Sequence, residues 1–85
     1  MTSKVMAEKI LERWGFHSLD DRSAQAPVLL AISLGLGSLF DENTDAERTW
    51  IGSFHPALQA RPIDLILDGL DGDVLELVNK ERGLD

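Results

Sequence analysis

Apolar residues recur every three or four positions along most of the chain, which is the spacing of one face of an α-helix. In "SKVMAEKILERWG" this spacing predicts a first helix from Lys4 to about Trp14. Ser3 can cap its start, and Gly15 follows the last periodic residue as a helix stop does. The side chains expected to face inward are Met6, Ala7, Ile10, Leu11 and Trp14.

The next segment, "FHSLDDRSAQAP", carries a weaker helical signal. Ser18, with Asp21 three residues later, imitates a capping box and predicts a short helical turn. This turn is expected to end before Pro27, because a proline disfavours helical backbone at the residue in front of it, here Ala26.

The central run "PVLLAISLGLGSLF" fits two kinds of structure. Its large apolar residues alternate with small ones as in a buried strand, and they also form one face of a helix. The run exceeds the usual strand length and Pro27 suits a first helical position, so a helix is favoured. Gly35 and Gly37 each cost about 1 kcal/mol relative to alanine inside a helix, which indicates close approach by another element.

A capping box predicts the start of the next helix. The Thr44 hydroxyl can accept a free amide at the helix start, and the Glu47 carboxylate can reach back to the amide of Thr44. The helix is expected to run from Asp45 to about Ser53, followed by a turn and an irregular stretch up to Arg61. Its inward side chains are expected to be Ala46, Trp50 and Phe54.

Two further helices are predicted in the last third of the chain. Pro62 sits where a helix tolerates proline, and Gly69 offers a left-handed exit after an apolar stripe formed by Ile63, Ile66, Leu67 and Leu70. Asp71 can cap a last helix from Gly72 to about Arg82, with Gly83 as its stop. The inward residues of this helix are expected to be Val74, Leu75, Leu77 and Val78.

These elements predict an all-α fold, a compact bundle of five or six short helices without a sheet. Residues 1–85 are expected to form a single domain, because two domains of about 40 residues each could not bury enough apolar surface. The hydrophobic fraction of 44% and the charged fraction of 27% are ordinary for a globular chain.

The charge of the chain is unevenly distributed. The net charge is −7, and residues 41–85 hold eleven acids and four bases, whereas residues 1–40 hold four of each. Such a surface repels phosphates, so DNA binding by this chain alone is disfavoured. The chain has no cysteine, no apolar run long enough for a membrane span and no signal-peptide pattern at its start, so a cytoplasmic protein is expected.

The residues that could carry chemistry have structural explanations. The two imidazoles, His17 and His55, are interpreted as turn residues, and no nucleophile motif or phosphate loop is present. The acids of "DLILDGLDGDVLE" fail the EF-hand spacing in the registers that start at Asp68 and Asp71. Trp14 and Trp50 are both assigned to the core, since each lies on the apolar face of its helix. We therefore expect no enzyme activity, no cofactor and no bound metal.

The order of the residues from 39 to 85 resembles the toxin-binding domain of the Xre/MbcA/ParS antitoxins (the DUF2384 type). The segment runs from Leu39 through an alanine, Trp-Ile, His-Pro, Ala-Leu, Arg-Pro-Ile-Asp-Leu-Ile and an acidic break to a Val-rich helix that closes on Gly83. The positions that match the pattern and would form its scaffold are Ala46, Trp50, Pro56, Leu58, Arg61, Pro62, Leu65 and Ile66.

The chain departs from the family pattern at two places. Gln59 and Ala60 replace the usual glycine pair. Residues 1–38 form a shortened N-terminal helical region without room for a full recognition helix, although most members of the family carry a helix-turn-helix there. The resemblance therefore implies neutralisation of a toxin with reduced or absent operator binding.

In this family the antitoxin packs its C-terminal part against a RES-domain toxin that consumes NAD and blocks the entrance to the toxin's pocket. Carried over, the partner-binding residues are Lys80, Glu81, Arg82, Gly83, Leu84 and Asp85. The alternative for these residues is a frayed C-terminus. Two other functions stay open: a DNA-binding repressor with a degenerate helix-turn-helix, and a small helical protein-interaction domain without a toxin. A homodimer is also open.

Overall fold

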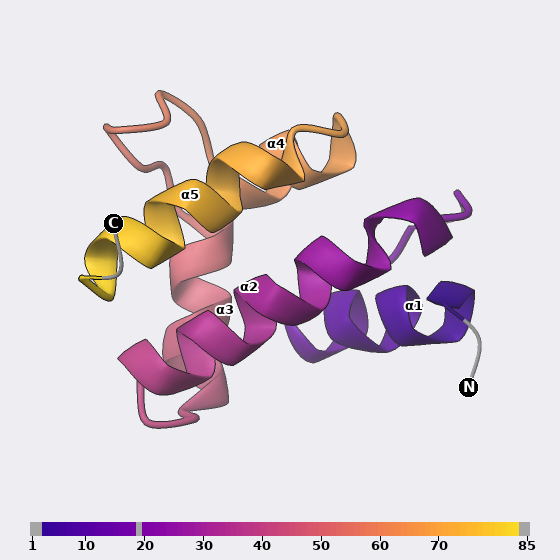
Figure 1. Ribbon diagram of the computed structural model, residues 1–85, viewed down its shortest axis with the longest axis horizontal. Helices are drawn as coiled ribbons and strands as arrows, with labels where there is room; N and C mark the ends of the chain where they lie inside the picture. Colours follow the sequence, from indigo (N-terminus) through magenta and orange to yellow (C-terminus); the bar gives the residue numbers. More distant parts are fainter. Residues whose placement is uncertain (1–2, 19, 84–85) are drawn as a thin grey trace.

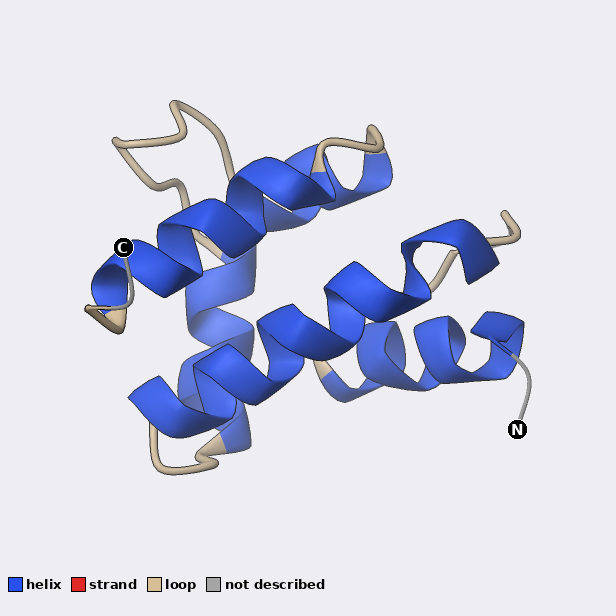
Figure 2. Ribbon diagram, in the orientation of Figure 1, coloured by secondary structure: helices blue, strands red, loops and turns tan. Residues whose placement is uncertain are grey.

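The computed structural model describes residues 3–18 and 20–83, and the fold is all-α as predicted (Figure 2). In chain order the elements are α1 (Ser3–Arg13), the 3₁₀ turn η1 (Ser23–Gln25), α2 (Ala26–Leu39), α3 (Thr44–Gly52), α4 (Pro62–Leu67) and α5 (Asp71–Glu81). The described residues contain no strand. His55 and Ala60 alone form an isolated antiparallel bridge, which closes the loop between α3 and α4.

Helix α2 is the centre of the molecule (Figure 1). It packs along α1 on one side and along α5 on the other, while α3 crosses behind it and α4 lies against α5 (Figure 1). Every α-helix contributes to one hydrophobic core, whose buried members are Ala7, Ile10, Leu11, Trp14, Ala26, Leu29, Ile32, Leu36, Ile51, Ile63, Ile66, Val74 and Val78. The parts of the chain before and after residue 39 therefore share their interior.

The contact between α2 and α5 is close because α2 has a glycine there. A Cβ atom built on Gly35 would lie 2.5 Å from Cγ1 of Val78, a separation so short that α2 or the Val78 side chain would have to shift. The prediction of a close approach is confirmed at this position. Gly37 is different, since a Cβ atom added to it would meet Cγ of Glu42 at 3.6 Å, an ordinary contact with the following turn.

The segment before α2 differs from its prediction. Ala26 is helical, with φ −52° and ψ −46°, so Pro27 did not end the turn in front of it. The Ser18 hydroxyl accepts from the amide of Asp20 and from Nε of Arg22, and the Asp21 carboxylate bonds the first amide of η1 instead. The 3₁₀ turn leads directly into α2, where the missing N–H of a proline in the first turn costs no hydrogen bond.

Two side chains of this segment hold the end of α4. Nη1 of Arg22 donates to the Leu67 carbonyl at 2.8 Å, and Nε2 of Gln25 donates to the Ile66 carbonyl at 2.7 Å. Carbonyls at a helix C-terminus have no partner within the helix. The Ile66 carbonyl also accepts the amide of Gly69 at 3.1 Å, and the bonds from Arg22 and Gln25 add side-chain partners at this helix end. The polar residues around η1 thus fix α4 to the N-terminal half.

The predictions that Thr44 caps α3 and that Asp71 caps α5 are both wrong. The side chain of Asn43, rather than that of Thr44, accepts the amide of Ala46 and caps α3. Asp71 is the first residue of α5, 8% exposed, and accepts a bond of 2.8 Å from Nε2 of Gln25. Leu70 occupies the N-cap position of α5 and is 49% exposed, so it does not belong to the buried stripe of α4.

That change of direction follows from Gly69. This glycine has φ +84°, the left-handed conformation predicted for the exit from α4, and it turns the chain away from the face that buries Ile63 and Ile66. Gly15 and Gly83 take the same conformation after α1 and α5, as the sequence predicted.

Candidate partner-binding surface

The inner face of α3 carries an acid. Glu47 and Ile51, one helical turn apart, are both fully buried. The Glu47 carboxylate forms an ion pair with Nη2 of Arg13 at 3.0 Å, which connects α3 to the end of α1. The predicted role of Glu47 in a capping box is therefore wrong, because its side chain points into the molecule and not back along its own helix.

This rotation of α3 changes the position of its aromatic residues. Trp50 lies beside the buried face and is partly buried against the core. Phe54 was expected to face inward, but it is 64% exposed. The physical reason is that α3 ends at Gly52 and Ser53 is extended, with φ −105° and ψ 147°, so the helical spacing no longer applies at Phe54.

An open apolar groove of about 430 Å³ follows the outer side of α3. We call it the aromatic groove, and its lining residues are Phe40, Ala46, Thr49, Trp50, Ser53, Phe54 and His55. The rings of Trp50 and His55 meet edge to face, with centroids 5.8 Å apart and planes at 62°. The groove thus runs from the end of α2 to the loop beyond α3.

His55 joins the aromatic groove to the last helix. Its Nδ1 accepts the amide of Ala57 at 3.2 Å, and its Nε2 lies 3.1 Å from a carboxylate oxygen of Glu81. An acceptor at Nδ1 places the proton of a neutral ring on Nε2, which then donates to Glu81. The side chain of this turn residue is 24% exposed, so the ring is partly enclosed by these contacts.

A second groove, of about 330 Å³, lies on the other side of the loop between α3 and α4. We call it the leucine groove, since Leu58, Leu65 and Leu77 line it. The polar lining consists of two acids and one base, Asp73, Glu76 and Lys80. Nζ of Lys80 is 3.9 Å from the Glu76 carboxylate, and both side chains are more than half exposed, so this pair contributes little stability.

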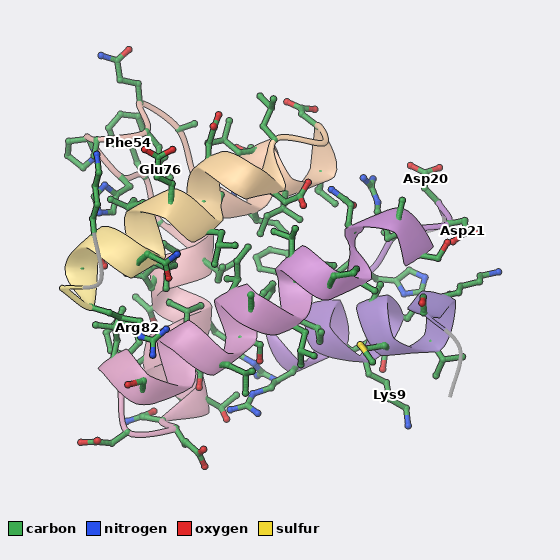
Figure 3. The ribbon with its side chains drawn as sticks, viewed as in Figure 1. Lys9, Asp20, Asp21, Phe54, Glu76 and Arg82 are labelled. Carbon is green, nitrogen blue, oxygen red and sulfur yellow. The ribbon has the colours of Figure 1, made fainter. Side chains whose placement is uncertain are left out.

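The residues predicted to bind a partner cluster around the end of α5. Lys80 lines the leucine groove, Glu81 holds His55 beside the aromatic groove, and Arg82 extends toward Gly35 on α2 (Figure 3). Gly83 ends the helix with φ +77°. The remaining two predicted residues, Leu84 and Asp85, lie outside the described residues.

The residues of the family-like scaffold are divided between the two grooves, the core and the loop between α3 and α4. Ala46 and Trp50 line the aromatic groove, Leu58 and Leu65 line the leucine groove, and Pro62 and Ile66 are buried beneath them. Pro56 is exposed in the loop between the two grooves.

Arg61 has a defined partner at the start of α4. Its guanidinium donates to both carboxylate oxygens of Asp64, at 3.0 and 2.9 Å. These hydrogen bonds hold the pKa of the Asp64 carboxyl below its ordinary value. Arg61 is therefore exposed but paired.

Sequence reasoning missed Phe40 and Phe54 as surface residues. Phe54 comes two residues after Gly52, and a helix stop at that glycine was the one signal that could have placed it outside the helix. Phe40 is partly buried at the C-cap of α2, where it can both contact the core and line the groove.

Among residues 3–18 and 20–83, no group of three or more His, Asp or Glu side chains is arranged to hold a metal ion. In the same part of the chain, no single helix has the length and apolar composition that a membrane span requires. The segments Ser23–Leu39 and Thr44–Gly52 meet that test only as a pair, with a bend of 120° between them.

Comparisons with protein-family models, with curated proteins and with solved structures find no match to this chain.

Proposed function

We propose that this protein is a non-catalytic binding domain of the antitoxin type, which occludes a RES-type, NAD-consuming toxin. The proposal starts from the order of motif residues between Leu39 and Gly83, which resembles the toxin-binding domain of Xre/MbcA/ParS antitoxins. The observation that supports it best is a single contact. The hydrogen bond between His55 and Glu81 joins the aromatic groove to the last turn of α5, where the resemblance puts the partner-binding residues.

This arrangement suits occlusion. A neutralising protein needs a rigid scaffold and an interface of about 800 Å² on its own side. Here the scaffold is the shared core, and the candidate interface combines exposed aromatic surface with the charged side chains of Lys80, Glu81 and Arg82. Aromatic residues and arginine are enriched at the residues that dominate binding energy in protein interfaces.

Co-expression tests this function. The protein is produced in cells together with the product of the open reading frame beside its gene, which the proposal expects to be a RES-type toxin, and growth and cellular NAD are measured. A variant that lacks Arg82, Gly83, Leu84 and Asp85 should lose protection while its helical circular dichroism is unchanged, because α5 ends at Glu81 and is kept. The matched control is Lys9→Ala, an exposed change on α1 at the opposite end of the molecule, which should protect fully (Figure 3).

Two results would overturn the proposal. One is a toxin that remains lethal beside the intact protein, and the other is full protection by the truncated variant. A gel shift with the upstream DNA at low salt tests the repressor alternative. No retardation is expected, because Ala26–Leu39, the helix that follows the turn, has no charged side chain with which to contact phosphates.

A further inference from the structure

We propose that the aromatic groove binds a segment of the partner protein that inserts one large apolar side chain and carries lysine or arginine on both sides of it. The identity of the partner as a toxin rests on the proposed function. The chemistry of the bound segment rests on the groove itself and on the charges around it.

The apolar part of the proposal comes from the lining. Of the three phenylalanines and two tryptophans in the chain, Phe40, Phe54 and Trp50 line this groove. Phe54 leaves 64% of its surface exposed, whereas Trp14 is 1% exposed in the core. Large aromatic side chains gathered in an open groove are typical of the residues that dominate a protein interface.

The turn between α2 and α3 supplies charge at one end of the groove. Asp41 and Glu42 directly follow Phe40, and both have left-handed backbone, with φ of 51° and 62°. A helix that ends in this conformation usually has glycine there, because a side chain in the left-handed region costs roughly 1 kcal/mol or more. Both side chains are exposed directly after the lining residue Phe40, and Glu42 also extends over Gly37 of α2, so their negative charge lies at the α2 end of the groove.

Further acids surround the groove. The carbonyl of Asp45 accepts the hydroxyl of Thr49, a lining residue, and the Asp45 side chain is exposed at the start of α3. At the other end, Glu81 contacts His55. The two arginines nearest in the fold are directed elsewhere, since Arg48 donates to the Arg13 carbonyl and Arg82 packs toward Gly35.

The acids around the aromatic groove favour one kind of ligand over others. A basic segment gains attraction at both ends of the groove while its apolar side chain fills the middle. A second copy of this chain would bring Asp41, Glu42 and Asp45 of each copy toward one another, and a nucleic acid would bring phosphates to them. Both are repelled, so a basic protein segment is the occupant that the surface fits.

The test uses the full chain and a synthetic probe. The probe is a nine-residue peptide with a central phenylalanine, two lysines on each side of it and glycine or serine elsewhere. It is titrated into the ¹⁵N-labelled protein, and backbone amide shifts are followed by NMR. The largest shifts are expected at Trp50, Phe54 and His55. Two control peptides replace either the phenylalanine by glycine or the lysines by glutamates, and each should bind at least tenfold more weakly.

Variants of the protein separate the two parts of the proposal. Phe54→Ser should weaken probe binding at least tenfold, whereas Leu34→Ser, a change at a side chain that is 66% exposed on α2, should leave it unchanged. The double variant Asp41→Asn, Glu42→Gln should weaken binding about two- to fivefold at low salt and have no effect at 1 M salt, where charge attraction is screened within about 3 Å.

Several outcomes would overturn the inference. Equal binding of the glutamate peptide would exclude a basic occupant, and equal binding of the glycine peptide would exclude an apolar anchor. Self-association that Phe54→Ser abolishes would make the groove an interface between copies. The outcome is separate from that of the proposed function: if Phe54→Ser still protects cells from the toxin, this inference fails alone, and if the probe binds while the toxin stays lethal, the proposed function fails alone.

Discussion

Helices α3 and α5 each bury one acid, and the position of that acid decides what the rest of the helix leaves on the surface. In α5 the buried acid is Asp71, at the first position, where it accepts from Gln25 and leaves the following turns free to bury Val74 and Val78. In α3 the buried acid is Glu47, which occupies the middle of the inner face together with Ile51.

The consequence is visible in the aromatic residues. Because Glu47 takes the inner face of α3, Trp50 lies at its margin and the chain carries Phe54 outward after the helix ends. Helix α5 has no such displacement, and its valines reach α2 closely enough to exclude a side chain at position 35. The polar contact of Glu47 thus accompanies the open aromatic groove beside α3. Apolar packing instead gives the close contact between α5 and α2, which we call the closed interface.

The strongest test of this comparison removes the partner of Glu47. Arg13→Met keeps much of the apolar stem but leaves a buried carboxylate unpaired, and Oε1 of Glu47 already has no hydrogen-bond partner within the described residues. Loss of one member of a buried pair costs about 3–5 kcal/mol, and the 42% exposure of Arg13 lowers the expected loss to about 2–3 kcal/mol.

The measurement is the free energy of unfolding by urea. The double variant Arg13→Met, Glu47→Leu should recover most of the loss, because neither charge is then buried. If Arg13→Met alone changes stability by less than about 0.5 kcal/mol, the ion pair does not determine the position of α3.

The closed interface is tested at Gly35. Gly35→Ala places a methyl group against Val78, and the expected net loss is about 1–2 kcal/mol, since overpacking outweighs the better helix propensity of alanine. Gly37→Ala is the matched control on the same helix. It should be neutral or stabilise by up to about 1 kcal/mol, because its added methyl group makes an ordinary contact. Equal effects of the two changes in thermal unfolding would contradict the comparison.

The open groove predicts a smaller effect on folding. Phe54→Ser should change the free energy of unfolding by less than about 0.5 kcal/mol, because most of the ring is already in contact with solvent. Chemical denaturation followed by circular dichroism measures this. A loss above about 2 kcal/mol would mean that Phe54 belongs to the core, as its helical spacing first predicted.

The smallest effect is expected at the exposed pair of Arg61 and Asp64. Hydrogen bonds from Arg61 hold the Asp64 pKa below its unfolded value, so the pair stabilises the protein above that value. The contribution is lost as pH falls through the lower, folded pKa. Arg61→Ala should raise the Asp64 pKa toward its ordinary value in a ¹³C carboxyl titration. An unchanged titration would show that the pair does not form in solution.

Periodicity predicted the helices because their apolar faces are also their buried faces. The bounds of α1 and α2 were within one residue of the prediction, and Gly15, Gly69 and Gly83 ended helices as expected. The capping predictions failed at Thr44 and Asp71. Which side chain caps a helix depends on the tertiary contacts of the neighbouring side chains. Local sequence spacing gives no information about the contact of Glu47 with Arg13 or that of Asp71 with Gln25.

The candidate site was less predictable for a related reason. The sequence identified the end of α5 as the candidate site. The aromatic groove, however, depends on the rotation of α3, and that rotation is accompanied by the contact between Arg13 and Glu47, which are 34 residues apart in the chain. Phe54 fitted an inward position only if the helix continued past Gly52. Exposed aromatic residues of this kind cannot be separated from core residues by composition, since both have the same hydrophobicity.

The two tryptophans give the molecule a pair of independent optical signals. Trp14 is 1% exposed in the core, so its emission should report unfolding of the whole chain. Trp50 lies at the groove with the His55 ring against it. Its emission should therefore respond to occupancy of the groove while that of Trp14 stays constant. A variant that keeps one tryptophan can be read for folding or for binding without any added dye.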